Sequence, residues 1–220
     1  MYNRKFKNIL NLNPCSLTNK YDPLEEEDMS KVMTKKLSEI ANVFTGVRIK
    51  RHEKGTTQTK QAIIHKSITQ NSSKITPEEV KVNNEINEKY FTQENDIIYK
   101  LQGTTFGKRI TNQTGLIVTH SFAIIRIKKE YNPVYVENFL NYPTIQNELK
   151  IIANESLIPQ INVKTLQRLK IRIPSKEEQE KYAKITEVLD ERIKTNQELI
   201  ANDEEMKLSL ISQMIGDNHE

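Results

Sequence analysis

Two stretches of this chain are rich in the side chains that bind phosphate groups and base edges. Residues 47–74 carry seven Lys or Arg and one acidic residue, and residues 101–129 carry five Lys or Arg and no acidic residue. Lys and Thr suit phosphate oxygens, whereas Arg on guanine and Asn or Gln on adenine form the paired hydrogen bonds that distinguish bases in the major groove. The two basic stretches therefore predict a surface that binds a polyanion, with double-stranded DNA as the expected ligand.

The candidates for DNA contact are the cationic, amide and hydroxyl side chains of these stretches, which we expect in loops between strands and helices. They are Arg48, Lys50, Arg51, Lys54, Lys60, Lys66, Gln102, Thr104, Lys108, Arg109 and Asn112. The alternative is a pair of ordinary solvated loops, since exposed loops are commonly polar and basic. Two such stretches at distant positions favour the binding surface.

The residue types give no sign of catalysis. An adenine methyltransferase would show an Asn/Asp-Pro-Pro-Tyr site, whereas Asn141-Tyr-Pro-Thr has the wrong order, and the six glycines include no G-x-G-x-x-G loop. Asp96 is followed by apolar residues and suits the start of a strand better than a nuclease site. The histidines lack metal-ligand spacing; they are His52, His65, His120 and His219. We expect no catalytic residue, no metal ion and no cofactor.

Composition limits the class of protein. The chain has 220 residues, of which 36% are hydrophobic and 28% charged, as in a globular protein. No apolar run approaches the roughly 18 residues that a membrane helix needs, and the N-terminus lacks the apolar core of a secretory signal. With Cys15 as the single cysteine, no internal disulfide or multi-cysteine zinc site can form. We expect a cytoplasmic protein without a membrane segment.

Apolar patterns predict the elements that must position the basic loops. Strands are expected at residues 96–101, 116–118 and 122–127, and helices at residues 134–142, 143–153 and 163–169. A short apolar-periodic segment at residues 37–43 is broken by Thr45-Gly46. The predicted class is α+β, in which a globular α/β domain is followed by a long helix that forms a coiled coil.

Residues 174–216 are expected to form that helix. Pro174 suits a first helical position because its missing N–H would be unpaired there, and Glu177, Glu178 and Glu180 lie near the positive end of the helix dipole. Such a helix is much longer than the globular mean of about 11–12 residues. It therefore needs a partner.

Counting along this helix in alternating steps of three and four residues defines a seam, whose side chains are apolar at both ends and polar in the middle. The residues expected to mediate dimerisation are Tyr182, Ile185, Leu189, Asn196, Leu199, Met206 and Leu210. Residues 176–220 carry six basic and twelve acidic residues, so this part would be repelled by a polyanion. The alternative is an amphipathic helix packed on its own domain, but the length favours a helix that extends away from the domain.

Five segments together resemble the specificity subunit of type I restriction-modification systems. They are Leu37–Gly46 (LSEIANVFTG), Glu94–Ile98, Ser156–Ile161 (SLIPQI), Leu166–Pro174 and Glu178-Gln179. The resemblance implies a protein that reads DNA and has no chemistry of its own. Family members carry two target-recognition domains, each followed by a long helix, and they dock methyltransferase (M) subunits and a motor-nuclease restriction (R) subunit.

This sequence has one recognition domain and one helix, which predicts a half-length specificity subunit. The expected parts are an N-terminal extension of unknown role at residues 1–34, a target-recognition domain at residues 35–173 and a dimerisation and spacer helix at residues 174–216. A homodimer would read a palindrome split by a spacer, and pairing with a different half would give an asymmetric target. The alternatives are a coiled-coil protein that binds nucleic acid non-specifically, and the recognition fragment of a fused methyltransferase-specificity polypeptide.

Overall fold

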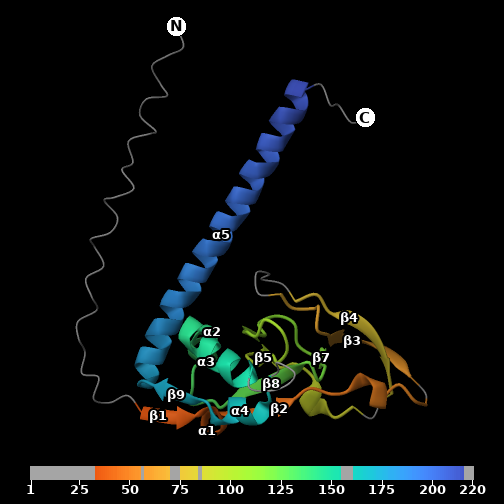
Figure 1. Ribbon diagram of the computed structural model, residues 1–220, viewed down its shortest axis with the longest axis vertical. Helices are drawn as coiled ribbons and strands as arrows, with labels where there is room; N and C mark the ends of the chain where they lie inside the picture. The colour runs from red at the N-terminus through yellow and green to blue at the C-terminus, as the bar shows by residue number, and fades with distance from the viewer. Residues whose placement is uncertain (1–32, 56, 70–74, 84–85, 155–160, 216–220) are drawn as a thin grey trace. The chain divides into compact units, whose positions relative to one another are not determined.

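The computed structural model describes residues 33–55, 57–69, 75–83, 86–154 and 161–215 (Figure 1). Most of the predicted SLIPQI motif and all residues before Met33 lie outside these ranges. Met33 and Thr34 belong to the first strand. Strand β1 therefore includes two residues of the segment that the sequence analysis assigned to the N-terminal extension.

Nine strands form three small sheets. The strands are β1 (Met33–Lys36), β2 (Ala41–Thr45), β3 (Gln58–Ile63), β4 (Glu78–Val82), β5 (Ile97–Lys100), β6 (Gly107–Arg109), β7 (Ile117–Val118), β8 (Phe122–Ile127) and β9 (Lys170–Ile173). One sheet has the order β2-β8-β5-β6 with antiparallel neighbours, a second has the order β4-β3-β7, and β1 pairs with β9. The predicted strands β5, β7 and β8 are confirmed within one or two residues.

Strands β5 and β8 occupy the middle of the four-stranded sheet, and both of their faces are buried. Ile97 and Tyr99 of β5 pack in the cluster formed with the helices, whereas Ile98 packs in the cluster formed with the second sheet. On β8, Ile125 and Ile124 divide in the same way. Because side chains alternate across a strand, a strand covered on both faces is apolar throughout, which is why the sequence predicted these strands well.

The helices are α1 (Leu37–Ile40), α2 (Pro133–Asn141), α3 (Pro143–Asn154), α4 (Val163–Arg168) and α5 (Lys176–Ile215), with short 3-10 turns η3 (Ile49–Arg51) and η4 (Glu88–Tyr90). The three predicted helices α2, α3 and α4 are confirmed. Each of α2 and α4 begins at an asparagine that accepts backbone hydrogen bonds, Asn132 for α2 and Asn162 for α4. Side chains from all of the first four helices pack against one face of the four-stranded sheet.

The long helix begins differently from the prediction. Pro174 lies before the helix, which starts at Lys176. The Glu178 amide and the Ser175 hydroxyl are 3.3 Å apart, and Glu178 Oε2 accepts from the Ser175 amide at 2.8 Å. This reciprocal pair is a capping box. It satisfies orphan amides more directly than a proline at the first position would.

Beyond its first turns, α5 has no cover within the described residues. Only Gln179 and Ala183 of α5 are buried, whereas Leu189, Leu199 and Leu210 are 42–56% exposed. The alternative of a helix packed along its own domain is therefore wrong. No helix in the described ranges is long and apolar enough to cross a membrane.

The two basic stretches are only partly loops, which corrects the prediction. Lys60 lies within β3, and Lys108 and Arg109 lie within β6. Strand β6 has only three residues, the first four residues of β3 are polar, and each strand pairs with another strand of its sheet. Their formation depends on that pairing and not on an apolar pattern of their own.

Candidate nucleic-acid interface

The first basic stretch begins in the turn after β2. Gly46 allows this turn, because a Cβ at this position would collide with the carbonyl groups of Val118 and Thr119. The chain then enters η3, where the Arg51 amide donates to the Arg48 carbonyl at 3.1 Å. Ile49 packs against the cluster below the second sheet. The anchored Ile49 leaves its cationic neighbours at the surface.

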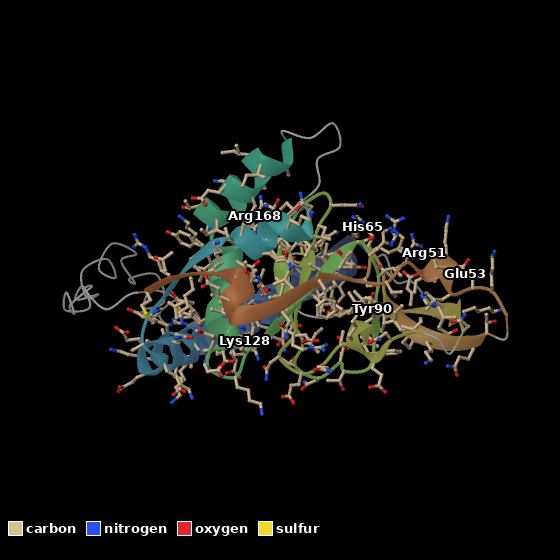
Figure 2. The ribbon with its side chains drawn as sticks, turned by 90° about the horizontal axis from the view of Figure 1, so that it is seen from below. Arg51, Glu53, His65, Tyr90, Lys128 and Arg168 are labelled. Atoms are coloured by element: carbon tan, nitrogen blue, oxygen red, sulfur yellow. The ribbon has the colours of Figure 1, made fainter. Side chains whose placement is uncertain are left out.

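Arg48, Lys50, Arg51 and Lys54 are all exposed, and none of their charged side-chain groups has a hydrogen-bond or ion-pair partner among the described residues. Figure 2 shows Arg51 beside Glu53 on the surface of this turn. We call these four cations the η3 cluster. Unpaired exposed cations are available for phosphate oxygens or base edges.

The η3 cluster is held against the end of β4 by Asn83. The backbone amide of Asn83 donates to the His52 carbonyl at 2.7 Å, and the side-chain Nδ2 of Asn83 donates to the Lys54 carbonyl at 3.4 Å. A ring nitrogen of His52 lies 3.3 Å from Asn83 Oδ1. His52 therefore has a structural contact in this turn, and the loop that carries Lys54 is fastened at two points.

The next two predicted cations have partners. Lys60 Nζ lies 5.1 Å from the centre of the Phe91 ring, a cation–π contact. Lys66 Nζ forms an ion pair with Glu78 at 2.9 Å, although its side chain remains 74% exposed. Lys81 is exposed on β4 directly opposite Thr59. Lys81 was not predicted, but it lies on the exposed face of the β3–β4 pair, opposite the face that carries Lys60, and is a further candidate.

The second basic stretch lies in a different environment. Thr104 and Lys108 line a polar cleft of about 530 Å³ together with Glu137 of α2 and Asp190 of α5. Burial lowers the pKa of Lys108 below its ordinary value, while Glu137 partly opposes the shift. Gln102 is half-buried at the beginning of this stretch. Thr104 and Lys108 lie beside helices α2 and α5, whereas the η3 cluster lies beside β4.

Asn112 differs from the other candidates of the second stretch, because it is exposed in the turn after β6. It has no partner among the described residues. An exposed amide of this kind can donate to and accept from a base edge.

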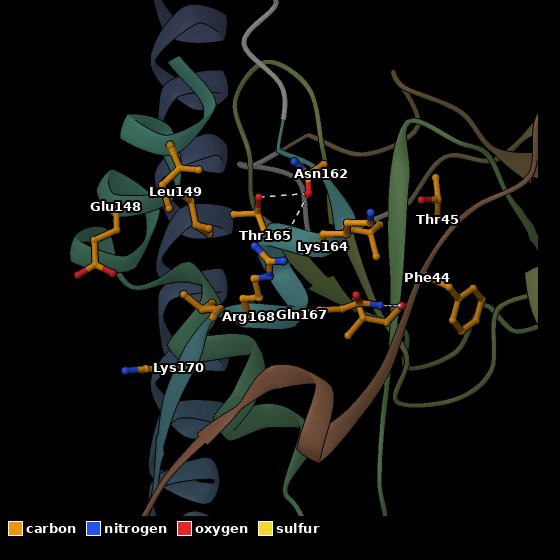
Figure 3. Close-up of a pocket in the computed structure, with 14 residues that line it drawn as sticks. Phe44, Thr45, Glu148, Leu149, Asn162, Lys164, Thr165, Gln167, Arg168 and Lys170 are labelled. Atoms are coloured by element: carbon orange, nitrogen blue, oxygen red, sulfur yellow. Dashed lines mark hydrogen bonds between the residues drawn. The ribbon is translucent and has the colours of Figure 1, made fainter. Parts of the chain in front are cut away.

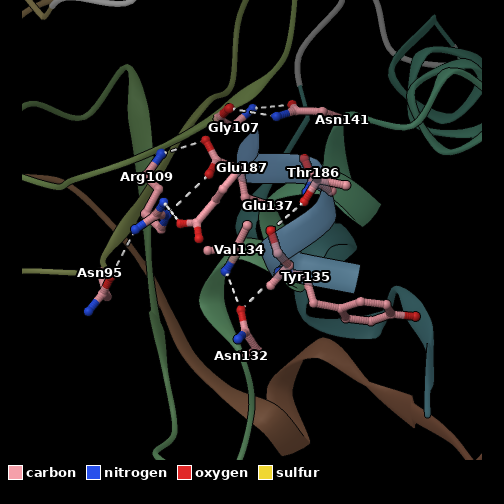
Figure 4. Close-up of polar contacts among 12 residues, drawn as sticks. Asn95, Gly107, Arg109, Asn132, Val134, Tyr135, Glu137, Asn141, Thr186 and Glu187 are labelled. Atoms are coloured by element: carbon pink, nitrogen blue, oxygen red, sulfur yellow. Dashed lines mark hydrogen bonds and ion pairs between the residues drawn. The ribbon is translucent and has the colours of Figure 1, made fainter. Parts of the chain in front are cut away.

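Each nitrogen of the Arg109 guanidinium has a partner. Its Nη2 lies 2.9 Å from Glu187 Oε1, its Nε lies 3.4 Å from Glu137 Oε2, and its Nη1 donates to Asn95 Oδ1 at 3.2 Å (Figure 4). The Arg109 side chain is only 18% exposed. A guanidinium in this state is a poor candidate for DNA, and we revise its predicted role accordingly.

A third group of cations was missed by the sequence reading. Lys164, Arg168 and Lys170 line a groove of about 1050 Å³ between α3, α4 and the edge strand β2 (Figure 3). Gln167 Nε2 donates to the Val43 carbonyl at 2.9 Å and so fixes α4 to that strand. Among the described residues of the lining, Glu148 is the one that is acidic. The signal was present, since residues 161–173 contain four Lys or Arg and no acid.

The pairing of β1 with β9 adds to this positive region. Lys36 lies directly opposite Lys170, and both are exposed. Like charges directly opposite each other destabilise a sheet. An anion bound near them would reduce this repulsion.

A family comparison decides what kind of domain carries these surfaces. The model of the type I restriction modification DNA specificity domain matches residues 29–202. The chain belongs to this family. The match includes both predicted basic stretches, the groove beside α4 and more than half of α5.

Solved structures share the fold of this specificity domain. The HsdS subunit from Thermoanaerobacter tengcongensis aligns with a TM-score of 0.57 and 14% identity over 79% of this chain and 41% of that chain. A structure that describes the assembly and conformational transition of the type I R-M system aligns with a TM-score of 0.62 and 18% identity over 85% and 49%. The specificity domain thus spans less than half of either chain. A search of curated proteins gave no significant match.

Within the described part of the specificity domain, no group of three or more His, Cys, Asp or Glu residues could hold a metal ion. His65 and His120 are exposed, and His219 lies outside the described ranges.

Proposed function

We propose that this chain acts in DNA recognition as a specificity subunit of a type I restriction-modification system, to which it supplies one recognition domain and one spacer helix. The observation that carries the proposal is the joining of one family-matched recognition domain to one long helix whose apolar side is exposed. The domain would bind double-stranded DNA, and the chain itself would have no enzymatic activity. As a protein that acts on chromosomal DNA, it would work in the cytoplasm.

The DNA surface that we propose starts from the η3 cluster and extends to Lys81 on the exposed face of the β3–β4 pair and to Lys66 beyond the end of β3. Lys60 lies on the opposite face, against Phe91. The support for this surface is that the cations of the η3 cluster are exposed and unpaired, as phosphate contacts require. The cations beside α4 would contribute further phosphate contacts or long-range attraction. Arg109 and Lys108 are left out of the direct DNA surface because their neighbours are acidic.

The long helix would pair with a second copy of the chain. Exposed apolar side chains extend along α5 from Tyr182 to Ile215. Burying apolar area is worth about 25 cal/mol per Å², so a helix with this much exposed apolar surface favours association. The paired helices would carry two recognition domains, present a bipartite target and dock the methyltransferase and restriction subunits.

The decisive experiment co-expresses the chain with the methyltransferase subunit of its own system and maps methylated adenines across the genome. A palindromic motif split by a spacer is the expected result, because identical domains read identical half-sites. An asymmetric split motif would point instead to pairing with a different half-subunit, and would contradict the homodimer alone.

A genome without any sequence motif would contradict the whole proposal. The non-specific coiled-coil protein would then account for the binding, since phosphate contacts alone depend on salt but not on sequence. Competition with unrelated DNA checks this independently, because a specific protein prefers its target by about 10³-fold or more. If methylation occurs only when this chain is part of one polypeptide with a methyltransferase, the result would favour the alternative of a recognition fragment of a fused methyltransferase-specificity polypeptide.

A further inference from the structure

The root of α5 is attached to the recognition domain mainly by polar contacts. Gln179 is 2% exposed, and its Oε1 accepts from the Asn132 amide at 3.0 Å. Two turns further along, the Thr186 hydroxyl accepts from Asn138 Nδ2 at 2.8 Å. Both asparagines belong to the start or the body of α2. The direction in which α5 leaves the domain therefore depends on directional hydrogen bonds more than on apolar packing.

Arg109 adds a contact that links α5 to the four-stranded sheet as well as to α2. It lies on the edge strand β6 of the four-stranded sheet, and it binds Glu137 of α2 on one side and Glu187 of α5 on the other (Figure 4). The Arg109 amide also donates to Glu137 Oε1 at 2.9 Å. Sheet, helix α2 and helix α5 thus meet at one guanidinium.

Because of the position of Glu187 along α5, its contact with Arg109 restrains the direction of the helix. Glu187 lies eight residues beyond Gln179, and so restrains α5 well away from its first buried residue. A helix of 40 residues is about 60 Å long. A tilt of about 10° at the root would move its far end by about 10 Å, which is close to the length of three base pairs at 3.4 Å each.

We propose that Arg109 is a positioning residue, which fixes the angle between the recognition domain and α5 through Glu137 and Glu187 and thereby limits the spacer lengths that the two half-sites can have. The consequence for the spacer rests on the proposed function; the angle does not. Half-site sequence would be read elsewhere, by the η3 cluster and its neighbours. Loss of the Arg109–Glu187 pair therefore relaxes spacing without changing which bases are read.

The angle can be measured in the full chain without DNA or partner subunits. Cys15 is the single cysteine, so a Cys15→Ser background accepts two spin labels, at Asn42→Cys on β2 and Asp203→Cys on α5. Both positions are exposed. Dilution with unlabelled protein suppresses the signal from labels on different copies. Double electron–electron resonance then measures the distance between the label on the domain and the label on the helix.

The test variant is Glu187→Lys, which places a cation against Arg109. Glu187 is 49% exposed, so the variant keeps the domain folded, and an unchanged melting temperature verifies this. Glu191→Lys is the matched control, because Glu191 makes the same charge change one turn further along and its side chain has no partner among the described residues. We expect one narrow distance peak in the parent chain and the control, and loss of that single peak in Glu187→Lys.

Equal distance distributions for Glu187→Lys and Glu191→Lys would overturn the positioning role, whatever the chain binds. The methylation map adds the functional readout. Glu187→Lys is expected to methylate the same half-sites at more than one spacer length, whereas Glu191→Lys keeps the parent spacer. An unchanged spacer together with a broadened distance peak would refute the link from angle to spacing, and a parent chain without a motif would refute the proposed function alone.

Discussion

Arg126 binds Asp96 through two parallel hydrogen bonds, with Nε 2.9 Å from Oδ1 and Nη2 2.8 Å from Oδ2. Asp96 is 1% exposed, and its Oδ2 also accepts from the Gln93 amide at 2.9 Å. The pair joins β8 to the turn before β5. A carboxylate that the sequence placed at the start of a strand is thus the anchor of a turn and a buried ion pair.

Asp96→Ala is expected to destabilise the domain by about 3 kcal/mol, at the lower end for a broken buried pair, because Arg126 keeps some exposure. Urea unfolding measures the change. Glu94→Ala is the control, since Glu94 is exposed and its removal should change the stability by at most about 0.5 kcal/mol. Equal losses for the two variants would show that the pair contributes nothing particular.

The η3 cluster predicts a change in both affinity and salt dependence. Replacing Arg48 and Arg51 together with Ala should weaken DNA binding, and each lost phosphate contact should reduce the slope of log K against log salt by about 0.9. Binding titrations at several salt concentrations measure both. Lys129→Ala removes an exposed cation outside the cluster and should leave the slope unchanged; the same slope in all variants would exclude the cluster from the DNA surface.

Glu137 predicts a pH dependence for Arg109→Met. Burial raises the pKa of Glu137, and Arg109 opposes that shift. Without the guanidinium, Glu137 loses its ion pair and keeps only the hydrogen bond from the backbone amide of residue 109 and the weaker attraction of Lys108, which should cost about 2 kcal/mol at neutral pH. Because the folded pKa then lies further above the unfolded one, the folded state binds the proton more tightly, and stability falls as pH rises between the two values.

Part of the loss should therefore be regained on acidification through that window, as measured by urea unfolding at pH 5 and pH 7. Arg172→Met, which removes an exposed arginine, should show neither effect. A loss in Arg109→Met that is the same at both pH values would mean that Glu137 is not the group responsible.

The start of α5 should respond to pH in the opposite sense. Hydrogen bonds from Ser175 lower the pKa of Glu178. A depressed carboxyl pKa contributes stability above its ordinary value of 4.5, and this stability is lost as pH falls through the folded value. The protection factors of the amides at residues 176–180, which correct for the intrinsic effect of pH on exchange, should fall under acid in the parent chain, and Ser175→Ala should show lower protection already at neutral pH. Equal exchange in the parent and the variant would rule out the cap.

Sequence patterns predicted the parts of the fold that burial determines. Strands β5 and β8 are apolar because both faces are covered, and α2 and α4 begin at asparagine caps that can be read directly. Strands β3, β4 and β6 were not predicted because polar residues predominate in them, so pairing with neighbours and not an apolar pattern specifies them. Local patterns cannot supply that information.

The candidate site also contains residues that the sequence could predict and residues that it could not. Exposed cations of the η3 cluster could be found from composition, because a turn rich in Lys and Arg remains at the surface. The role of Arg109 could not, since its partners Glu137 and Glu187 lie 28 and 78 residues away in the sequence. A basic residue in a basic stretch was therefore interpreted as a DNA contact, whereas the fold surrounds it with acids.

Self-association through α5 gives the last prediction, and the helix supplies its own control. Leu199 and Leu208 are both exposed, at 56% and 68%, and they lie nine residues apart. At about 100° per residue, nine residues place them on opposite sides of the helix. Leu199 belongs to the predicted seam with Leu189 and Leu210, whereas Leu208 does not.

Leu199→Asp should raise the dimer dissociation constant by at least about tenfold, because a charge buried between helices would be unpaired, whereas Leu208→Asp should leave association unchanged. Sedimentation equilibrium measures both constants. The DNA affinity of a single recognition domain should be the same in the two variants, since the η3 cluster lies on another part of the fold. If Leu208→Asp dissolved the dimer and Leu199→Asp did not, the helices would pair through the opposite side. If neither did, α5 would bind something other than its own copy.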